Sequence, residues 1–221
     1  MEKELSNVIK EGIETIGLSW NPELQRRLEI LYDEITLFNP SYKLVGASGY
    51  DLVTRHILDS LAPAPLISKV LSGNSVGDLG SGSGLPGIVL ASAMENINFT
   101  LVERMGRRAG FLRNTLALTG LVQKTKILEC DLKDVRDTFD GVVFRAFRPL
   151  EDIIADLHRI VVPQGNVFAY KSSDENLVIE KKALENYERK IGKKVFDFEV
   201  ISYEVPFCNS KRCLMVLHRI G

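Results

Sequence analysis

The stretch Asp78-Leu79-Gly80-Ser81-Gly82-Ser83-Gly84-Leu85-Pro86-Gly87 decides the fold of this chain. It follows the apolar run Ser75–Leu79 and precedes the apolar residues 88–91, an order that indicates a strand, a tight turn and a helix. Glycines suit such a turn because they adopt positive φ easily and have no Cβ to obstruct a ligand. Pro86 is expected as the first helical residue. The stretch therefore predicts a site for a nucleotide-sized ligand.

The position of the glycines relative to the strand indicates which ligand the turn binds. The pattern Gly82-x-Gly84-x-x-Gly87 matches the dinucleotide fingerprint, but it begins too far beyond the end of the strand. S-adenosylmethionine has no phosphate groups and carries positive charges, which the carboxylate of Asp78 would attract. We therefore expect S-adenosylmethionine as the cofactor, bound by Asp78, Gly80, Gly82, Gly84 and Leu85. A nicotinamide-dependent oxidoreductase remains the alternative enzyme.

An acidic residue follows the next expected strand, at residues 99–102. This residue, Glu103, lies about twenty residues beyond the glycine turn, where Rossmann-like folds place the acidic side chain that binds ribose hydroxyls. Glu103 is therefore the expected ribose ligand. It would serve a nicotinamide cofactor equally well, so it indicates a nucleoside without choosing between the two cofactors.

Several segments together carry a resemblance to a known family. They are the glycine stretch 78–88, Thr100-Leu-Val-Glu-Arg-Met-Gly-Arg-Arg-Ala-Gly-Phe-Leu-Arg113, Arg55-His-Ile-Leu-Asp-Ser60 and Arg145-Ala-Phe147. With these motifs the chain, from about residue 28 to residue 219, resembles the bacterial glucose-inhibited division protein B family. Members of that family are 16S ribosomal RNA methyltransferases (methyltransferase G) specific for guanine N7.

The resemblance implies an α/β fold, a cofactor and a substrate. The fold is the Rossmann-like class I methyltransferase sheet of seven strands with a terminal antiparallel hairpin, and the cofactor is S-adenosylmethionine. The substrate is a guanine of small-subunit ribosomal RNA, as free RNA or in the small ribosomal subunit. Asp131, Leu132 and Lys133 are expected beside the adenine ring, although the family usually has an acidic residue where Lys133 falls.

Arg145 is the expected catalytic residue, because methyltransferases place the groups that meet the acceptor after the fourth strand. We expect it in the acceptor pocket, where it holds guanine O6, a phosphate or the cofactor, rather than in an ion pair. Guanine N7 carries a free lone pair, so its methylation needs no general base. The rate would come mainly from alignment of the reacting atoms.

The net charge of the chain is only −1, so an RNA site must be a local basic patch. The candidates that fall beside the cofactor loops or resemble the family's motifs are Arg55, His56, Arg107, Arg108, Lys171 and Arg212. A non-catalytic RNA-binding module of ribosome assembly is the alternative from another functional class. The intact glycine turn and Glu103 argue against that alternative, because a module without catalysis has no need of a cofactor.

The composition is that of a globular protein, with 45% hydrophobic and 26% charged residues among 221. We expect no membrane span, because no run of eighteen apolar residues occurs, and no signal peptide, because the N-terminus is charged. A cytoplasmic location is expected. The three cysteines form no Cys-x-x-Cys pair, so no metal site is expected.

The order of the expected elements divides the chain into a helical cap, residues 1–70, and a methyltransferase domain, residues 71–221. In the cap, apolar residues at helical spacing predict one helix over 5–16 and a second whose apolar face covers 24–38. The second helix is expected to end at Asn39-Pro40, and a third is expected over 55–61. Beyond it, strands alternate with helices, which favours a parallel sheet. The expected strands are 75–79, 99–102, 125–129, 141–144, 166–170, 195–205 and 212–219, and 174–192 is expected as a solvated helix.

Overall fold

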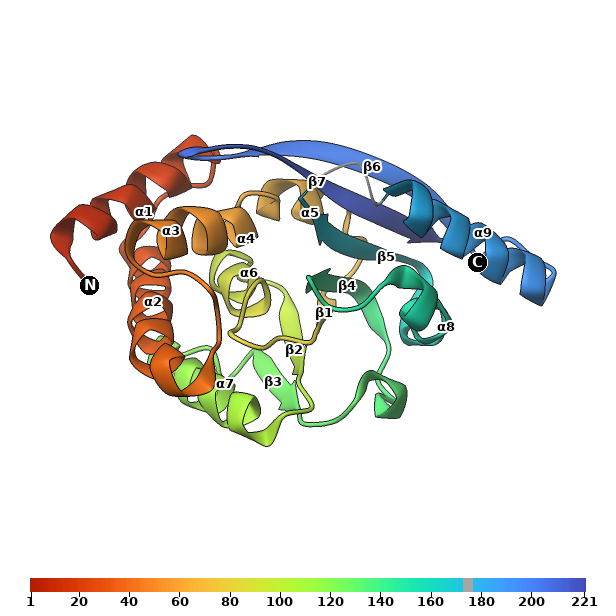
Figure 1. The fold of residues 1–221 in the computed structure, drawn as a ribbon, viewed down its shortest axis with the longest axis horizontal. Helices are drawn as coiled ribbons and strands as arrows, with labels where there is room; N and C mark the ends of the chain where they lie inside the picture. The colour runs from red at the N-terminus through yellow and green to blue at the C-terminus, as the bar shows by residue number, and fades with distance from the viewer. Residues whose placement is uncertain (173–176) are drawn as a thin grey trace.

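The computed structural model describes residues 1–172 and 177–221. Its centre is a seven-stranded sheet with the strand order β3-β2-β1-β4-β5-β7-β6. The strands are β1 (Ser75–Leu79), β2 (Asn98–Val102), β3 (Thr125–Leu128), β4 (Phe139–Arg145), β5 (Val161–Lys171), β6 (Phe196–Val205) and β7 (Cys208–Arg219). Figure 1 shows β6 and β7 as a long two-stranded hairpin that extends over the leading helices.

The first five strands are parallel and the last two form an antiparallel hairpin, as the sequence predicts. β1 pairs with β2 and with β4 in parallel register, whereas β7 is antiparallel to both β5 and β6. The change of strand order on the two sides of β1 brings the ends of β1, β2 and β4 together at one edge of the sheet. The predicted methyltransferase-type α/β sheet is therefore confirmed.

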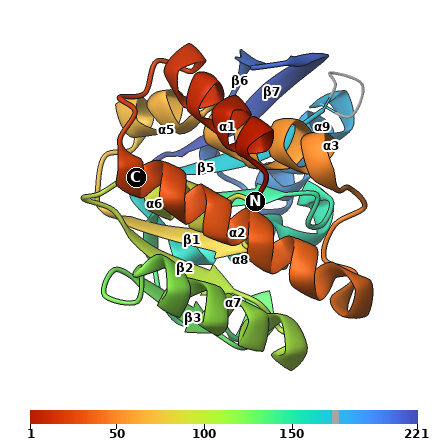
Figure 2. The same ribbon diagram turned by 90° about the vertical axis from the view of Figure 1, so that its left-hand side faces the viewer.

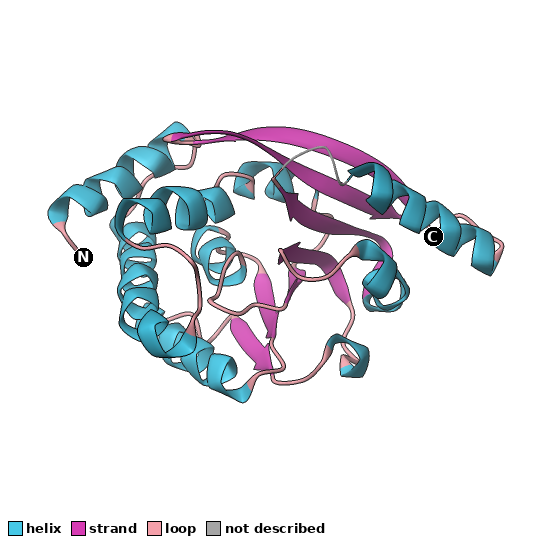
Figure 3. Ribbon diagram, in the orientation of Figure 1, coloured by secondary structure: helices cyan, strands magenta, loops and turns pink. Residues whose placement is uncertain are grey.

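Helices cover both faces of the sheet (Figures 1 and 3). On one face lie the helices α6 (Gly87–Ala93) and α7 (Gly106–Thr119), and on the other lie α8 (Leu150–Ile160) and α9 (Leu177–Ile191). A single turn of 3₁₀ helix, Leu132–Asp134, precedes β4. The buried side chains form two clusters, one on each face, as expected for a sheet whose central strands are apolar on both sides.

The leading helices complete the first of these two faces. They are α1 (Lys3–Thr15), α2 (Pro22–Tyr42), the short segments α3 (Gly49–Leu52) and α4 (Asp59–Leu61), and α5 (Ala64–Val70). Figure 2 shows α2 lying across α6 and α7. Leu28 of α2 and Ile57 are fully buried in the same cluster as Phe99 of the sheet. The leading helices therefore share the main core.

Two helix boundaries differ from the sequence-based prediction. Helix α2 continues past Pro40 to Tyr42, because a proline in the last turn removes only one backbone hydrogen bond, and the helix ends where Lys43 adopts a φ of 49°. Pro86 is not the first helical residue: α6 begins at Gly87, and Pro86 precedes it after a cis peptide bond. The third expected helix contains a wide π-helical segment, Val53–Leu58.

The strands at the carboxyl-terminal end of the chain are longer than predicted. β5 begins at Val161 rather than at residue 166, and β7 begins at Cys208 rather than at residue 212. Residues 209–211 are polar and exposed, so they carry no apolar alternation, yet the pairing of Val205 with Cys208 extends the ladder through them. The expected helix 174–192 is observed over Leu177–Ile191, and residues 174–176 of that expectation lie outside the described residues. Among the described residues, no helix is long and apolar enough to span a membrane.

Candidate active site

The glycine turn connects β1 to α6 at the edge of the sheet where the parallel strands end. Gly80, Gly82 and Gly84 have φ angles of 68°, 51° and 80°, which side chains adopt only with strain. The backbone N–H groups of Gly80 and Ser81 donate to the carbonyl of Val102, so the turn is held against the end of β2. A Cβ at Gly80 would lie 2.3 Å from the Phe147 ring. The turn therefore requires glycine at this position for two separate reasons.

Glu103 connects the end of β2 to the glycine turn. Its side chain is buried, with Oε2 accepting a hydrogen bond of 3.0 Å from the Gly82 N–H and Oε1 accepting one of 2.8 Å from the Met105 N–H. Each carboxylate oxygen can accept a second hydrogen bond. The backbone thus fixes the orientation of a carboxylate that retains the capacity to accept from two ribose hydroxyls.

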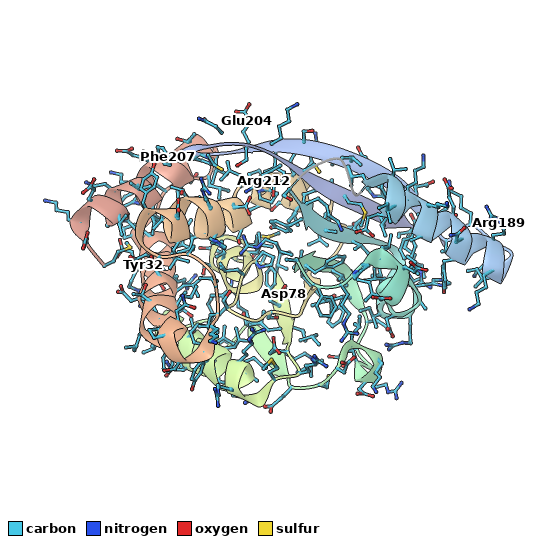
Figure 4. All side chains as sticks on the ribbon, in the orientation of Figure 1. Tyr32, Asp78, Arg189, Glu204, Phe207 and Arg212 are labelled. Atoms are coloured by element: carbon cyan, nitrogen blue, oxygen red, sulfur yellow. The ribbon has the colours of Figure 1, made fainter. Side chains whose placement is uncertain are left out.

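Asp78 is completely buried beneath the turn, near the centre of the molecule in Figure 4. Its carboxylate packs closely against Gly87 at the start of α6. If Gly87 carried a Cβ, that atom would lie only 2.4 Å from Asp78 Oδ2. Neither oxygen makes a hydrogen bond of standard geometry, and the Ser81 hydroxyl donates to the backbone carbonyl of Asp78 instead. Burial raises the pKa of Asp78 to about 7. Asp78 is therefore enclosed beneath the turn and has no surface exposed to solvent.

A pocket of about 240 Å³, here called the small pocket, opens between the glycine turn and the ends of β2 and β3. Glu103, Arg108, Asp131 and Leu132 line it, with Phe147 on its far side. Lys133 does not line it, although its backbone N–H donates to Asp131 Oδ1 at 3.4 Å. Of the residues predicted to bind the cofactor, Gly80, Glu103, Asp131 and Leu132 line the small pocket.

Of the three arginines that line the small pocket, Arg148 is paired with an acidic side chain, whereas Arg108 has an unsatisfied nitrogen. Arg148 donates to Asp131 Oδ2 at 2.9 Å, and its guanidinium lies 5.0 Å from the centre of the Phe147 ring. The guanidinium of Arg108 lies close to the glycine turn. If Gly82 carried a Cβ, that atom would lie 3.9 Å from Arg108 Nη1. The Nε of Arg108 is buried without a hydrogen-bond partner. An unsatisfied buried donor beside a pocket indicates a ligand acceptor at that point.

A second pocket, of about 760 Å³ and here called the large pocket, lies on the other side of Phe147 and Arg148. It lies between the π-helical segment, the end of β4 and the strands β5, β6 and β7, and the aromatic rings of Phe144, Tyr170 and Tyr203 line it. The two pockets share Ala146, Phe147 and Arg148. A group bound in one pocket would therefore lie next to a group bound in the other.

Asp59 forms ion pairs with two arginines at the large pocket. Its Oδ2 lies 3.0 Å from Arg145 Nη1, and its Oδ1 lies 2.9 Å from Arg212 Nε. The prediction that Arg145 forms no ion pair is therefore wrong, because Asp59 approaches it from the leading helices, which the strand pattern does not reveal. Arg145 still lines the large pocket. Arg212 is labelled in Figure 4 on the hairpin above Asp78.

His56 contacts Arg145 from the π-helical segment. Arg145 Nη2 lies 3.2 Å from His56 Nδ1, and Nη1 donates to the His56 carbonyl at 3.5 Å. Burial and the adjacent Arg145 guanidinium lower the pKa of His56. His56 is therefore a neutral acceptor toward Arg145, with its Nδ1 unprotonated.

The other basic residues that were predicted to bind RNA differ in their exposure and in their partners. Lys171 pairs with Glu180 at the wall of the large pocket and is mostly buried. Arg55 is exposed and pairs with Asp51 on the same helical segment. Arg107 is exposed, with its guanidinium 5.5 Å from the centre of the Tyr42 ring. Lys171 is therefore far less accessible to RNA than Arg55 and Arg107.

Sequence reasoning missed Asp59 and the two tyrosines of the large pocket. Asp59 belongs to the motif Arg55-His-Ile-Leu-Asp-Ser60, where it follows His56 by three positions and therefore lies on the same helical face. This spacing was the signal that could have identified it. Tyr170 and Tyr203 carried no such signal, because aromatic residues in strands more often belong to the core. Among the described residues, no group of three acidic, histidine or cysteine side chains is arranged to bind a metal.

The small pocket fits S-adenosylmethionine. Glu103 offers two oriented acceptors for the ribose, Arg108 offers an unpaired donor, and Gly80 of the glycine turn lines the pocket without a side chain. Together with the sheet topology, this site defines a methyltransferase that uses S-adenosylmethionine. The chain belongs to the GidB family, rRNA small subunit methyltransferase G, whose model matches residues 24–201. The family resemblance, the enzyme class and the cofactor that the sequence predicts are thereby confirmed.

Individual relatives agree with this assignment over most of the chain. A ribosomal RNA small subunit methyltransferase G from Actinobacillus pleuropneumoniae is 32% identical over 82% of this chain and 83% of its own length. A protein of the same name from Klebsiella pneumoniae is 30% identical over 98% of both chains. The solved structure of TYW2 from M. jannaschii in complex with AdoMet is similar in fold, with a TM-score of 0.53 and 16% identity over 73% of this chain and 77% of that one.

Proposed function

We propose that this protein transfers the methyl group of S-adenosylmethionine to N7 of a guanine in small-subunit ribosomal RNA. The observation that supports the proposal is the arrangement of the two pockets, which share Phe147 and Arg148, so that a cofactor in the small pocket would lie beside an acceptor in the large pocket. The relatives that match most of the chain are named for small-subunit ribosomal RNA, which supports this substrate. Free ribosomal RNA and the small ribosomal subunit are both substrates of the proposed class.

The small pocket would hold the cofactor. Glu103 would accept hydrogen bonds from the ribose hydroxyls, and the turn around Gly80, Gly82, Gly84 and Leu85 would hold the methionine part. Asp131, Leu132 and the backbone at Lys133 would border the adenine ring. Asp78 would act through the glycine turn, because it is completely buried. We place Arg108 here rather than at an RNA surface, because its unpaired Nε lies at the small pocket.

The chemistry demands orientation more than acid–base catalysis. S-adenosylmethionine supplies a methyl group bound to a positively charged sulfur. Guanine N7 has an available lone pair, so the protein has no proton to remove before the transfer. The neutral His56 is consistent with this requirement, because it accepts a hydrogen bond from Arg145 and holds that guanidinium in place. Arg145, as the proposed catalytic residue, would hold the acceptor guanine or an adjoining phosphate at the large pocket, where alignment can contribute several kcal/mol.

RNA beyond the target base would contact the rim of the pockets. Arg55 and Arg107 are exposed and would neutralise phosphates, which is the main source of RNA affinity. Arg212 and Lys171 would act at the pocket wall, where Asp59 and Glu180 already orient them. The helical cap, residues 1–70, would supply His56 and Arg55, and the methyltransferase domain, residues 71–221, would supply the remaining groups. A cytoplasmic location would follow from the ribosomal substrate.

Methyl transfer from labelled S-adenosylmethionine to small subunits, free ribosomal RNA and transfer RNA tests the proposal. Borohydride and aniline treatment then cleaves RNA at N7-methylguanine. We expect incorporated label with a single cleavage site in small-subunit ribosomal RNA. Label without cleavage would contradict the N7 assignment, whereas label in transfer RNA alone would contradict the substrate.

A further inference from the structure

We propose that Asp59 is a positioning residue that holds Arg145 and Arg212 in fixed orientations at the large pocket. This inference rests on the proposed function and adds to it the group that organises the acceptor site. Asp59 lies on the wall of the large pocket, and both arginines line the same pocket. Its role is to orient the guanidinium groups, not to contact the reacting atoms.

The geometry of the carboxylate fixes both arginines at once. One oxygen of Asp59 lies 3.0 Å from Arg145 Nη1 and the other lies 2.9 Å from Arg212 Nε. The Asp59 side chain is 7% exposed, and those of Arg145 and Arg212 are 17% and 16% exposed. At such low exposure the ion pairs are weakly screened by solvent, and charge-assisted hydrogen bonds of this length are strong.

The positions of the three residues in the fold show why one shared carboxylate is needed. Arg145 ends β4 and Arg212 lies on β7, and the sheet order places β5 between these two strands. Asp59 reaches both from the leading helices, at a sequence separation of 86 from Arg145 and 153 from Arg212. The hydroxyl of Tyr170, on the intervening β5, donates to the carbonyl of Ser60 at 2.9 Å and so holds the same helical turn against the sheet.

The group formed by Asp59, Arg145 and Arg212 carries a net positive charge at the large pocket. Two guanidinium groups face one carboxylate, and the neighbouring His56 is neutral. The pocket wall also carries Lys171, which pairs with Glu180, and Arg55 and Arg148, which pair with acidic residues outside the pocket, together with the exposed Glu151. Asp59 therefore keeps two like charges close together while one positive charge remains for a polyanionic acceptor.

Loss of this carboxylate would affect turnover more than RNA affinity. Without Asp59, both guanidinium groups would keep their charge and could pair with phosphates, but their directions would no longer be fixed. Affinity depends mainly on charge, whereas the rate depends on alignment, and a displacement of about 1 Å can reduce a rate by ~100-fold. The proposal therefore predicts different changes in kcat and KM.

The test compares Asp59→Asn with Asp51→Asn, in the full-length protein. Asp51 lies on α3, which continues through the π-helical segment into α4, and it pairs with Arg55, but both side chains are more than half exposed, so it is a matched control. For Asp59→Asn we expect kcat for methyl transfer to small-subunit RNA to fall about 10- to 100-fold, with KM for RNA unchanged or lower. The Kd for S-adenosylmethionine should not change. Asp51→Asn should keep the wild-type kcat.

A spectroscopic measurement tests the orientation directly. In ¹⁵N NMR spectra, the Nε–H of Arg212 should be protected from exchange with water in the wild-type protein, because it donates to Asp59. The signal should lose its protection in Asp59→Asn and keep it in Asp51→Asn. An unprotected Arg212 Nε–H in the wild-type protein would overturn the proposal even if Asp59→Asn failed to fold.

A double-mutant comparison separates positioning from a general structural role. If Asp59 acts through Arg145, then Arg145→Gln should lower kcat much less in the Asp59→Asn background than in the wild-type protein. The positioning role would be overturned if the two substitutions had additive effects on the logarithm of kcat, or if Asp59→Asn left kcat unchanged. A loss of activity in Asp59→Asn that matched a loss of folded protein would also overturn it. A wild-type protein that methylates no ribosomal RNA but shows the protected Arg212 signal would instead contradict the proposed function.

Discussion

The Oε2 atom of Glu103 accepts a hydrogen bond of 3.0 Å from the backbone N–H of Gly82. The ribose ligand expected from one motif and the glycine turn expected from another are therefore joined directly. The carboxylate orients the turn, and the turn orients the carboxylate. A change in either residue should alter both the cofactor site and the local backbone.

Replacement of Glu103 by Gln should weaken cofactor binding about 10-fold or more. The amide has only one acceptor oxygen, so at least one of the two backbone N–H groups loses its partner, at a cost of about 1–3 kcal/mol. Isothermal titration with S-adenosylmethionine measures the effect. Glu129→Gln is the control, because Glu129 is partly exposed and pairs with Arg113. Equal affinity in the two variants would exclude Glu103 from the cofactor site.

Replacement of Gly80 by Ala should impair both stability and cofactor binding. The new Cβ would strain a residue with φ of 68° and collide with the Phe147 ring. The strain alone costs about 1–2 kcal/mol. Gly17→Ala is a matched control, because Gly17 has φ of 84° but no atom near its Cβ position. In thermal unfolding Gly17→Ala should show the strain alone, and its cofactor affinity should equal that of the wild-type protein.

Asp78 should make the free protein less stable as the pH rises from about 4 to about 7. Its pKa of about 7 in the folded state exceeds the ordinary value of 3.8, so in this range the folded protein binds more protons than the unfolded chain. The free energy of unfolding contributed by this group therefore falls as pH increases, and then stays constant. Each pKa unit corresponds to ~1.4 kcal/mol.

The variant Asp78→Asn should lack this contribution to the pH dependence. Chemical unfolding of both proteins between pH 4 and pH 8 measures the difference, and the variant should gain stability relative to the wild-type protein as the pH rises. A constant difference across this range would show that Asp78 keeps the same protonation state in the folded and unfolded proteins.

The neighbouring residues Arg107 and Arg108 should have separable functions. Arg107→Ala should weaken RNA binding and reduce the slope of log affinity against log salt by about 1, because one phosphate contact is lost. It should not change the affinity for S-adenosylmethionine. Arg108→Ala should weaken cofactor binding, because its buried Nε lies at the small pocket. Cofactor titration and RNA binding at several salt concentrations distinguish the two, and identical profiles would contradict the assignment.

Much of the fold follows from local patterns in the sequence. The alternation of apolar strands with helices predicts a parallel sheet, and the ends of parallel strands must meet at one edge. For this reason the glycine turn, Glu103 and Asp131 could be assigned to one site before any coordinates were known. The lengths of β5 and β7 could not, because their polar ends are stabilised by backbone pairing with neighbouring strands and not by apolar side chains.

The sequence by itself therefore determined the sheet, the glycine turn and the class of cofactor, since each depends on short-range pattern and spacing. Only the tertiary structure decided which charged residues are free and which are paired. Arg145 and Arg212 meet at Asp59 because three distant segments converge there, and Arg107 and Arg108 separate because adjacent residues on a helix point in different directions. Such pairings depend on which elements become neighbours in space, and that information is not contained in any local segment of the chain.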